Sequence, residues 1–365
     1  MLTLAASTHG YWNLQTLWFF LIVVLWTGYF VLEGFDFGVG MLLPFVGRDV
    51  RERGTLIRTI GPVWDGNEVW LLVAGGATFA AFPGWYATLF SGFYLALFLV
   101  LVGLIVRGIA IEYRNKRPEE EWRRRWDTIL AVSSAVPALL WGVAFADMVH
   151  GVPIDAKGDF TGNLLDLLHP YALFGGLTTL ALFAFHGALF LGLRTTSVLE
   201  RRAHDTAVRL ALPASLLVFG FLVWTWANAA SAHDKGLVPG IVPIAAMFLP
   251  FAAAAFVRAG RPGFAFAATT VSIALLTLTL FLNLYPRVLV SSTGNAFSPT
   301  IFTTSSSHYT LTVMSIIALV LTPIVLLYQT WSYWVFRARL GNGDAADVRS
   351  PLELLGRTPL GKQQH

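Results

Sequence analysis

A chain of 365 residues is long enough for two or three ordinary soluble domains. Its composition points elsewhere, because 56% of the residues are hydrophobic and only 13% are charged, against about 25% charged residues in ordinary soluble domains. The low charge and the 28 Phe and 13 Trp residues exclude intrinsic disorder, and the absence of Cys excludes disulfide scaffolds, iron–sulfur clusters and thiolate catalysis. The composition therefore indicates an all-α integral membrane protein.

Nine segments are apolar and long enough to cross a bilayer, which takes roughly 20 residues of helix. In chain order they are expected at about 14–46, 61–82, 85–111, 128–150, 168–193, 207–232, 239–258, 264–284 and 308–336. Pro243 and Pro250 interrupt the seventh segment, although membrane helices tolerate proline better than soluble helices do. Nine crossings would place the two ends of the chain on opposite sides of the membrane.

The positive charges predict the orientation of these segments. All but three of the 25 Lys and Arg residues lie in alternate connections, at the segment ends beside them or in the C-terminal tail, and the exceptions are Lys157, Lys235 and Arg287. Since cytoplasmic connections are enriched in Lys and Arg, we expect the N-terminus outside and the C-terminus in the cytoplasm. The same distribution accounts for the net charge of +4 and favours a role in membrane orientation over nucleic-acid binding.

Short connections predict two bundles of four helices, with a ninth helix packed outside them. The first bundle is expected within residues 1–150 and the second within 151–290. Residues 291–365 would supply the ninth helix and a cytoplasmic tail. The polar segment 151–167 would separate the two bundles.

Five acidic residues lie within or beside the first three segments. Glu33 and Asp36 belong to the first, Asp65 and Glu68 begin the second, and Glu112 ends the third. Each of the first two pairs has i, i+3 spacing and therefore shares one helix face. A charge at the centre of a bilayer costs a few kcal/mol or more, so such residues normally face a bundle interior, a cavity or a partner. Together they form a ladder of carboxyls from the cytoplasmic surface toward the middle of the membrane.

Two interpretations of this ladder stay open. Carboxyls in poorly solvated surroundings hold and exchange protons near neutral pH, so the ladder predicts a proton relay in which Asp65 is the strongest candidate. In the alternative interpretation the acids pair with Arg58, Arg107 or backbone donors and only hold the first three segments together.

The histidine residues do not form a pattern typical of a haem-binding site in this chain. Haem needs axial ligands such as His, Met or Cys, and among eight His residues only His186 lies well inside a predicted segment. A single helical His is more often a hydrogen-bonded packing residue. No metal triad or phosphate-binding loop is apparent, so we expect the chain to bind neither a metal nor a cofactor.

Two motifs give the chain a specific resemblance. The segment Glu33–Gly40 and the segment Gly61–Leu71, which contains a WDGNxVW element, strongly resemble subunit II of the cytochrome bd quinol oxidases. The resemblance extends over essentially the whole chain and is most specific in the first 150 residues. Further matching positions are Phe82-Pro83, Ser91 to Tyr94, Arg107, Glu112 to Arg114, Trp126-Asp127, Gly142 to Phe145, His186 to Ala188 and Arg194-Thr195.

The resemblance implies a complex and a reaction. Oxidases of this family are heterodimers of the bacterial inner membrane that oxidise quinol and reduce oxygen to water without pumping protons. The resemblance implies that two b-type haems, haem d and the quinol-oxidising loop belong to subunit I, the partner of this chain. It also implies that subunit II has two four-helix bundles plus one helix and contributes to a proton route from the cytoplasm. Small single-span accessory subunits, membrane lipid and a structural quinone are further expected partners.

The resemblance also assigns roles to individual acids. Asp65 matches the aspartate at the entrance of the family's proton route, and Glu112 and Glu33 match acidic positions near it. Glu stands at 33 and 112 where some members have Asp, which keeps the charge and lengthens the side chain. Glu68 stands where some members have Gln, so its role does not follow from the family.

Two rival functions remain beside a haem-free oxidase subunit. A proton-coupled secondary transporter would use the buried acids and a duplicated bundle, although the second half of the chain lacks acids within its segments. A haem-carrying electron-transfer protein would use His186. Oxygen consumption with quinol, and the absorption spectrum of the isolated chain, separate these functions.

Overall fold

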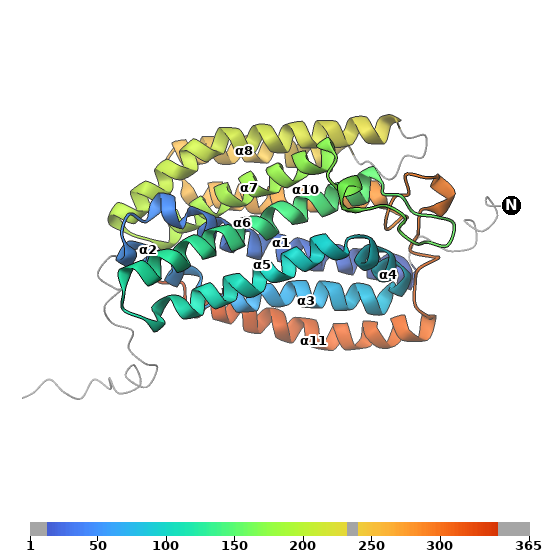
Figure 1. The fold of residues 1–365 in the computed structure, drawn as a ribbon, viewed down its shortest axis with the longest axis horizontal. Coiled ribbons are helices and arrows are strands. Elements are labelled where there is room, and N and C mark those ends of the chain that lie inside the picture. Colours follow the sequence, from blue (N-terminus) through green and yellow to red (C-terminus); the bar gives the residue numbers. More distant parts are fainter. Residues whose placement is uncertain (1–12, 232–239, 342–365) are drawn as a thin grey trace, which may run out of the picture.

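The computed structural model describes residues 13–231 and 240–341, and in these ranges the chain is mainly helical, with two longer connections at 151–169 and 285–307 (Figure 1). Its long helices run side by side along one common axis. One end of the bundle carries α2 and the opposite end carries α4, and we call these the α2 end and the α4 end. The helices are α1 (Leu14–Val46), α2 (Val50–Ile60), α3 (Trp64–Ala81), α4 (Pro83–Gly92), α5 (Tyr94–Tyr113), α6 (Glu120–His150), α7 (Pro170–Arg194), α8 (Ser197–Ser231), α9 (Ile241–Arg258), α10 (Pro262–Leu284) and α11 (His308–Val335).

The predicted all-α membrane architecture is confirmed. Eight helices in the described ranges are long and apolar enough to cross a bilayer: α1, α5, α6, α7, α8, α9, α10 and α11. The remaining predicted segment, 61–82, corresponds to α3, which lies among the long helices but has a polar first turn containing Asp65, Asn67 and Glu68. A ninth crossing by α3 therefore stays a prediction.

Two of the predicted boundaries differ from the structure for a physical reason. Helix α6 begins eight residues and α8 ten residues before the predicted segments, at Glu120 and Ser197. Both extensions are rich in charged residues, which a membrane-spanning criterion rejects but a solvated helix accepts. In α6 the i, i+4 ion pairs Arg124–Glu120 and Arg125–Glu121 lie on the exposed surface.

The third predicted segment is divided in two. The expected span at 85–111 appears as the short helix α4 and the longer α5, which are separated at Phe93. The predicted N-terminal position outside the membrane, the side chain of Lys235 and the cytoplasmic tail after residue 341 lie outside the described residues.

Helix α1 lies at the centre of the bundle. Every residue from Glu33 to Leu43 is buried, so this part of α1 has no face toward the surroundings, as expected for a helix enclosed by others. It contacts α3, α6, α7 and α10. Residues before and after position 150 thus share a continuous packed interior, and the division into two bundles stays a prediction.

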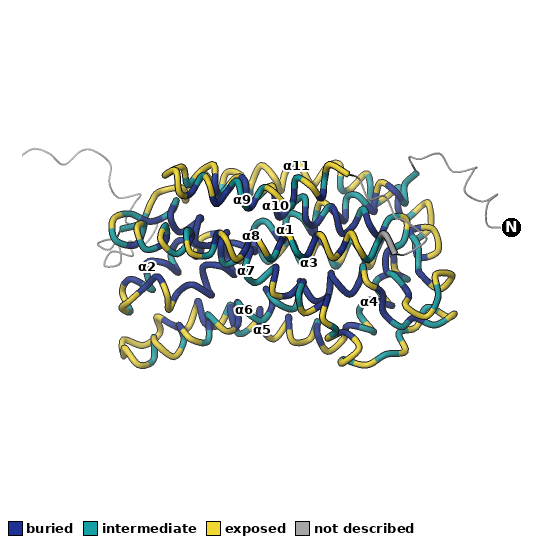
Figure 2. The backbone as a smooth tube through the Cα atoms, turned by 90° about the horizontal axis from the view of Figure 1, so that it is seen from above, coloured by how far each residue is buried: buried dark blue, intermediate teal, exposed yellow. Residues whose placement is uncertain are grey.

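The edges of the bundle are formed by the least buried helices. In Figure 2 exposed backbone follows α11 along one edge and α5 along the other, whereas buried backbone lies between them. Along α11 only Leu311 is buried, and this helix contacts only α1 and α3 closely. Helix α11 therefore packs as a peripheral helix, as the sequence predicts.

Two glycines allow α1 and α7 to cross at very short distance. A Cβ atom placed on Gly38 would lie 2.1 Å from the backbone oxygen of Phe183 and 2.7 Å from the Cα of Gly187. A Cβ atom on Gly187 would in turn lie 2.5 Å from the Cα of Gly38. Because the opposing atoms belong to the backbone, neither side chain can be accommodated by a rotamer change. The crossing requires glycine at both positions.

We predict that Gly38→Ala destabilises the protein by about 1–3 kcal/mol, because the added methyl group forces α1 and α7 apart. The matched control is Gly192→Ala, also on α7, where a Cβ would meet nothing within 4 Å. Thermal unfolding of the two purified variants measures the difference. Equal transition temperatures for both variants would show that the close crossing does not limit stability.

Candidate functional site

The buried guanidinium of Arg107 is the centre of an acidic cluster. Its Nη1 donates to Glu33 Oε2 at 2.8 Å and to Glu68 Oε1 at 2.7 Å, and its Nη2 lies 4.0 Å from Asp36 Oδ2. The side chains of Arg107, Glu33 and Asp36 are fully buried, whereas that of Glu68 is 22% exposed. The guanidinium also lies 4.9 Å from the ring centre of Phe37. We call Arg107 with Glu33, Asp36 and Glu68 the Arg107 cluster.

Three helices bring the cluster together. Helix α1 supplies Glu33 and Asp36 from one face, because residues three apart lie on the same side of a helix. Helix α3 returns antiparallel to α1 after the connection through α2 and supplies Glu68 from its first turns. Helix α5 supplies Arg107 about one and a half turns before its end. The cluster therefore lies within the bundle on the side of the α2 end.

The cluster has more acids than bases. Full ionisation would leave three carboxylates around one guanidinium, and burying an unpaired charge costs several kcal/mol. Within the described residues, Glu33 Oε1, Asp36 Oδ1 and the Nε and Nη2 atoms of Arg107 have no hydrogen-bond partner. A group of this composition lowers its free energy by retaining protons, and its free oxygen atoms provide positions that bind them. The excess of carboxyls makes the cluster a candidate site for proton binding.

The alternative interpretation, in which the acids only pair with basic groups and hold the first three segments together, agrees with part of this geometry. Glu33 and Glu68 do pair with Arg107, so the ion pairs join α1, α3 and α5 as that interpretation requires. Asp36 is held differently, because its closest partner is the Nδ2 group of Asn67 at 2.7 Å. Structural pairing and an excess of carboxyls thus occur in the same cluster.

A chain of hydrogen bonds leads from Asp36 to α11. Asn67 donates to Asp36, and its Oδ1 accepts from the hydroxyl of Tyr333 at 2.8 Å and from Gln329 Nε2 at 3.4 Å. Gln329 Oε1 in turn accepts from Trp70 Nε1 at 2.8 Å. Sequence reasoning did not select Tyr333 and Gln329. Gln329, the one amide side chain within α11, is the signal that would have indicated this contact.

The other two predicted relay residues lie on the surface. Asp65 is exposed in the first turn of α3, three residues before Glu68 and on the same face. Glu112 is exposed near the end of α5. In the described part of the chain neither carboxyl is bonded to the cluster. Of the five predicted residues, the structure brings Glu33, Asp36 and Glu68 together and places Asp65 and Glu112 at the α2 end.

The histidines are placed apart from this cluster. His186 is fully buried, its Nδ1 lies 2.7 Å from Thr269 Oγ1, and its ring stacks on Phe266 at 4.4 Å. At the α4 end, His169 Nε2 lies 2.8 Å from the buried carboxyl of Asp147. Across residues 13–231 and 240–341, no group of three or more metal-ligating side chains is assembled.

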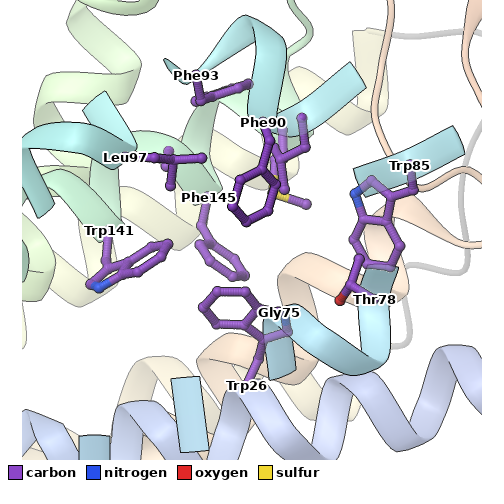
Figure 3. Close-up of a pocket in the computed structure, with 12 residues that line it drawn as sticks. Trp26, Gly75, Thr78, Trp85, Phe90, Phe93, Leu97, Trp141 and Phe145 are labelled. Carbon is purple, nitrogen blue, oxygen red and sulfur yellow. The ribbon is translucent and has the colours of Figure 1, made fainter. Parts of the chain in front are cut away.

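A small apolar cavity lies between α1, α3, α4, α5 and α6. Figure 3 shows aromatic side chains that surround it, among them Trp26, Trp85, Trp141 and Phe145. Its volume is about 20 Å³, close to that of one water site, but its walls offer almost no polar partner. Trp141 lines the cavity, and its Nε1 donates to the hydroxyl of Tyr29 at 3.0 Å. The cavity is suited to an apolar group and not to water.

Comparisons with known proteins agree with the motifs of α1 and α3. The family model for cytochrome bd terminal oxidase subunit II matches residues 14–336. Cytochrome bd ubiquinol oxidase subunit 2 of Bacillus subtilis (strain 168) is 41% identical over 90% of this chain and 98% of its own length. Cytochrome bd-I ubiquinol oxidase subunit 2 of Escherichia coli (strain K12) is 36% identical over 91% of this chain and 96% of its own length.

A solved structure shows the same fold. A chain of the bd oxidase from Geobacillus thermodenitrificans superimposes with a TM-score of 0.68, covering 88% of this chain and 97% of that chain, at 15% sequence identity. With its eight apolar helices and its bacterial relatives, the chain is a multi-pass protein of a bacterial inner membrane. The match over 14–336 and the identities above 30% show that the chain belongs to the cytochrome bd terminal oxidase subunit II family.

Proposed function

We propose that this chain is the haem-free subunit of a quinol oxidase of the aerobic respiratory chain. In this proposal a haem-bearing subunit I carries two b-type haems and haem d, oxidises quinol and reduces oxygen to water. The chain described here stabilises that partner and delivers protons to it. The Arg107 cluster carries the proposal, because three carboxyls around one guanidinium form a site that must hold protons.

The geometry suggests a direction for proton transfer. Asp65 is exposed at the α2 end, and Glu68 lies one turn further along the same face with its side chain partly exposed. Glu68 bonds Arg107, and Arg107 bonds Glu33. A proton taken up near Asp65 would therefore pass through Glu68 to the buried acids Asp36 and Glu33. Glu112 lies at the same end and would add negative charge at the entrance.

The exposed side of α3 supports a position for the partner subunit. Asp65 and Glu68 share this side with Leu72, Gly76 and Phe79, which follow at intervals of three to four residues. A Cβ on Gly76 would meet nothing within 4 Å, so a partner helix can approach closely there. A partner that covers this side of α3 and the apolar outer side of α5 would contact the relay directly.

The proposal places the α2 end in the cytoplasm. Among the described residues, Lys157 and Arg287 lie in the connections at the α4 end, whereas the connections at the α2 end and the helix ends beside them carry most of the Arg residues and Lys116. Positive charge is retained on the cytoplasmic side during membrane insertion. Protons would then enter from the cytoplasm, while quinol oxidation releases protons outside, so that turnover generates a membrane potential.

The remaining expected partners are lipid, a structural quinone and small single-span subunits. The aromatic walls of the cavity between α1, α3, α4, α5 and α6 suit an acyl or isoprenoid chain, and the present volume admits only the end of one. The exposed apolar side of α11 suits lipid or a single additional helix.

Quinol-dependent oxygen consumption by the purified complex tests the proposed activity. A haem-free chain in a complex that consumes oxygen with quinol supports the oxidase assignment. Solute uptake driven by a proton gradient, without oxygen consumption, would instead establish the alternative of a proton-coupled transporter.

We predict that Asp65→Asn and Glu68→Gln each lower the turnover number about tenfold or more and change the KM for quinol little, because proton delivery and not quinol binding is impaired. Glu121→Gln is the matched control, since Glu121 is an exposed acid at the same end outside the cluster. Steady-state oxygen consumption measures both constants. Unchanged turnover of fully assembled Asp65→Asn and Glu68→Gln complexes would contradict the relay.

Arg107→Leu is predicted to destabilise the complex by about 3–5 kcal/mol, because it leaves buried acids without their cation. Arg107→Lys keeps the charge but cannot provide the planar guanidinium that joins Glu33 and Glu68, so we expect an assembled complex with slow turnover. Yield, thermal stability and turnover of the two variants are compared. Normal stability of Arg107→Leu would show that the ion pairs do not hold α1, α3 and α5 together.

Single-cysteine labelling measures the orientation, because the natural chain has no Cys. Lys157→Cys, in the connection before α7, should react with a membrane-impermeant maleimide added outside intact cells. Lys116→Cys, in the connection between α5 and α6, should react only after the membrane is opened. The reverse pattern would overturn the proposed direction of proton entry.

A further inference from the structure

Tyr333 is the only side chain of α11 in the described residues that reaches Asn67 through a hydroxyl group. Its oxygen lies 2.8 Å from Asn67 Oδ1, and the Nδ2 group of Asn67 lies 2.7 Å from Asp36 Oδ2. Asn67 is fully buried, so solvent does not compete for either bond. The hydroxyl of Tyr333 is thus connected to a carboxyl of the Arg107 cluster through a single amide.

The chemistry of an amide makes this connection directional. One end of the Asn67 side chain only donates hydrogen bonds and the other end only accepts them. A hydroxyl that donates to Oδ1 therefore fixes the amide with its NH2 group toward Asp36. An NH2 group stabilises a carboxylate but offers nothing to the proton of a carboxylic acid. If the amide turned over, its oxygen would face Asp36 and would favour the protonated carboxyl.

We propose that Tyr333 is a positioning residue for Asp36, which acts by holding Asn67 in the orientation that stabilises the ionised, proton-accepting carboxyl. The inference deepens the proposed function and rests on Asp36 belonging to the proton relay. It gives α11 a role in the relay although no acid lies on this helix.

A second contact of α11 distinguishes positioning from anchoring. Gln329 Oε1 accepts a hydrogen bond from Trp70 Nε1 at 2.8 Å, and this bond joins α11 to α3. Gln329 Nε2 also donates to Asn67 Oδ1, but at 3.4 Å this bond is longer than the 2.8 Å bond from Tyr333, so the Tyr333 hydroxyl is the main donor to this oxygen. Trp70→Phe removes this bond and leaves the contact of Tyr333 with Asn67 in place. Tyr333→Phe removes the hydroxyl and leaves the bond of Gln329 with Trp70 in place. Each variant loses one hydrogen bond between the same two helices.

Infrared difference spectroscopy of the whole oxidase complex tests the proposal. The carboxyl stretching band of protonated Asp36 is identified by its loss in Asp36→Asn. In Tyr333→Phe at the same pH we expect the ratio of protonated to ionised Asp36 to rise about two- to tenfold, as removal of one hydrogen bond to the chain allows. Trp70→Phe should leave the ratio at its original value. An equal change in both variants, or none in Tyr333→Phe, would overturn the positioning role.

A second variant, Asn67→Leu, keeps the proposal testable if the Tyr333→Phe complex does not assemble. Asn67→Leu is close in size and removes the amide through which Tyr333 acts, so it should raise the same ratio. In the double variant with Tyr333→Phe the ratio should not rise further, because both changes remove one pathway. Additive effects of the two substitutions would contradict the proposal.

Failure of the relay has a different signature. If Asp36→Asn left turnover unchanged while Tyr333→Phe still altered the infrared band, the positioning of Asp36 would stand and the proposed proton delivery would be wrong. If Asp36→Asn slowed turnover while the band did not respond to Tyr333→Phe, the relay would stand and the positioning role would be wrong.

Discussion

The structure depends on one buried arginine that faces three carboxyls. Arg107 joins α1, α3 and α5 by ion pairs in a part of the molecule where solvent cannot stabilise any of these charges. Neither the acids nor the arginine would be stable there alone, since an isolated buried charge costs several kcal/mol. The proposed proton binding rests on the same shortage of positive charge that leaves the cluster unbalanced. In this proposal, structural pairing and proton exchange are two properties of one arrangement.

Helix α3 depends on its neighbours for its stability. Its first turn carries Asp65, Asn67 and Glu68, and this polar content makes α3 less apolar than the helices around it. Neighbouring helices supply partners for Asn67 and Glu68. Helices α1 and α5 supply the other members of the Arg107 cluster, and α11 supplies Gln329 and Tyr333, which bond Asn67. Its remaining side is open and apolar, which suits the partner subunit that the family requires. A helix with this composition would be poorly stable in lipid by itself.

Much of the fold and part of the site follow from the sequence. Hydropathy predicts the helices because an apolar segment in lipid must hydrogen-bond its own backbone, and a helix does this. The i, i+3 spacing correctly places Glu33 with Asp36 on one face. Spacing along one helix does not determine which neighbour it meets, so the pairing of Arg107 with Glu33 and Glu68 was one of several alternatives. The contact of Tyr333 with Asn67 joins residues 266 positions apart and depends on how a peripheral helix packs. The charged beginnings of α6 and α8 were missed because a membrane criterion ends where solvent begins.

Time-resolved proton uptake tests the central claim most directly. A single turnover of the complex with oxygen is started in vesicles, and the rate at which protons leave the inner aqueous phase is followed with a pH-sensitive dye for the original protein and for Asp36→Asn. The account predicts that uptake in the variant is slowed by about tenfold or more, while electrons still reach the haems of the partner at the original rate. Uptake at an unchanged rate in the assembled variant would contradict it and would leave the Arg107 cluster with a structural role only.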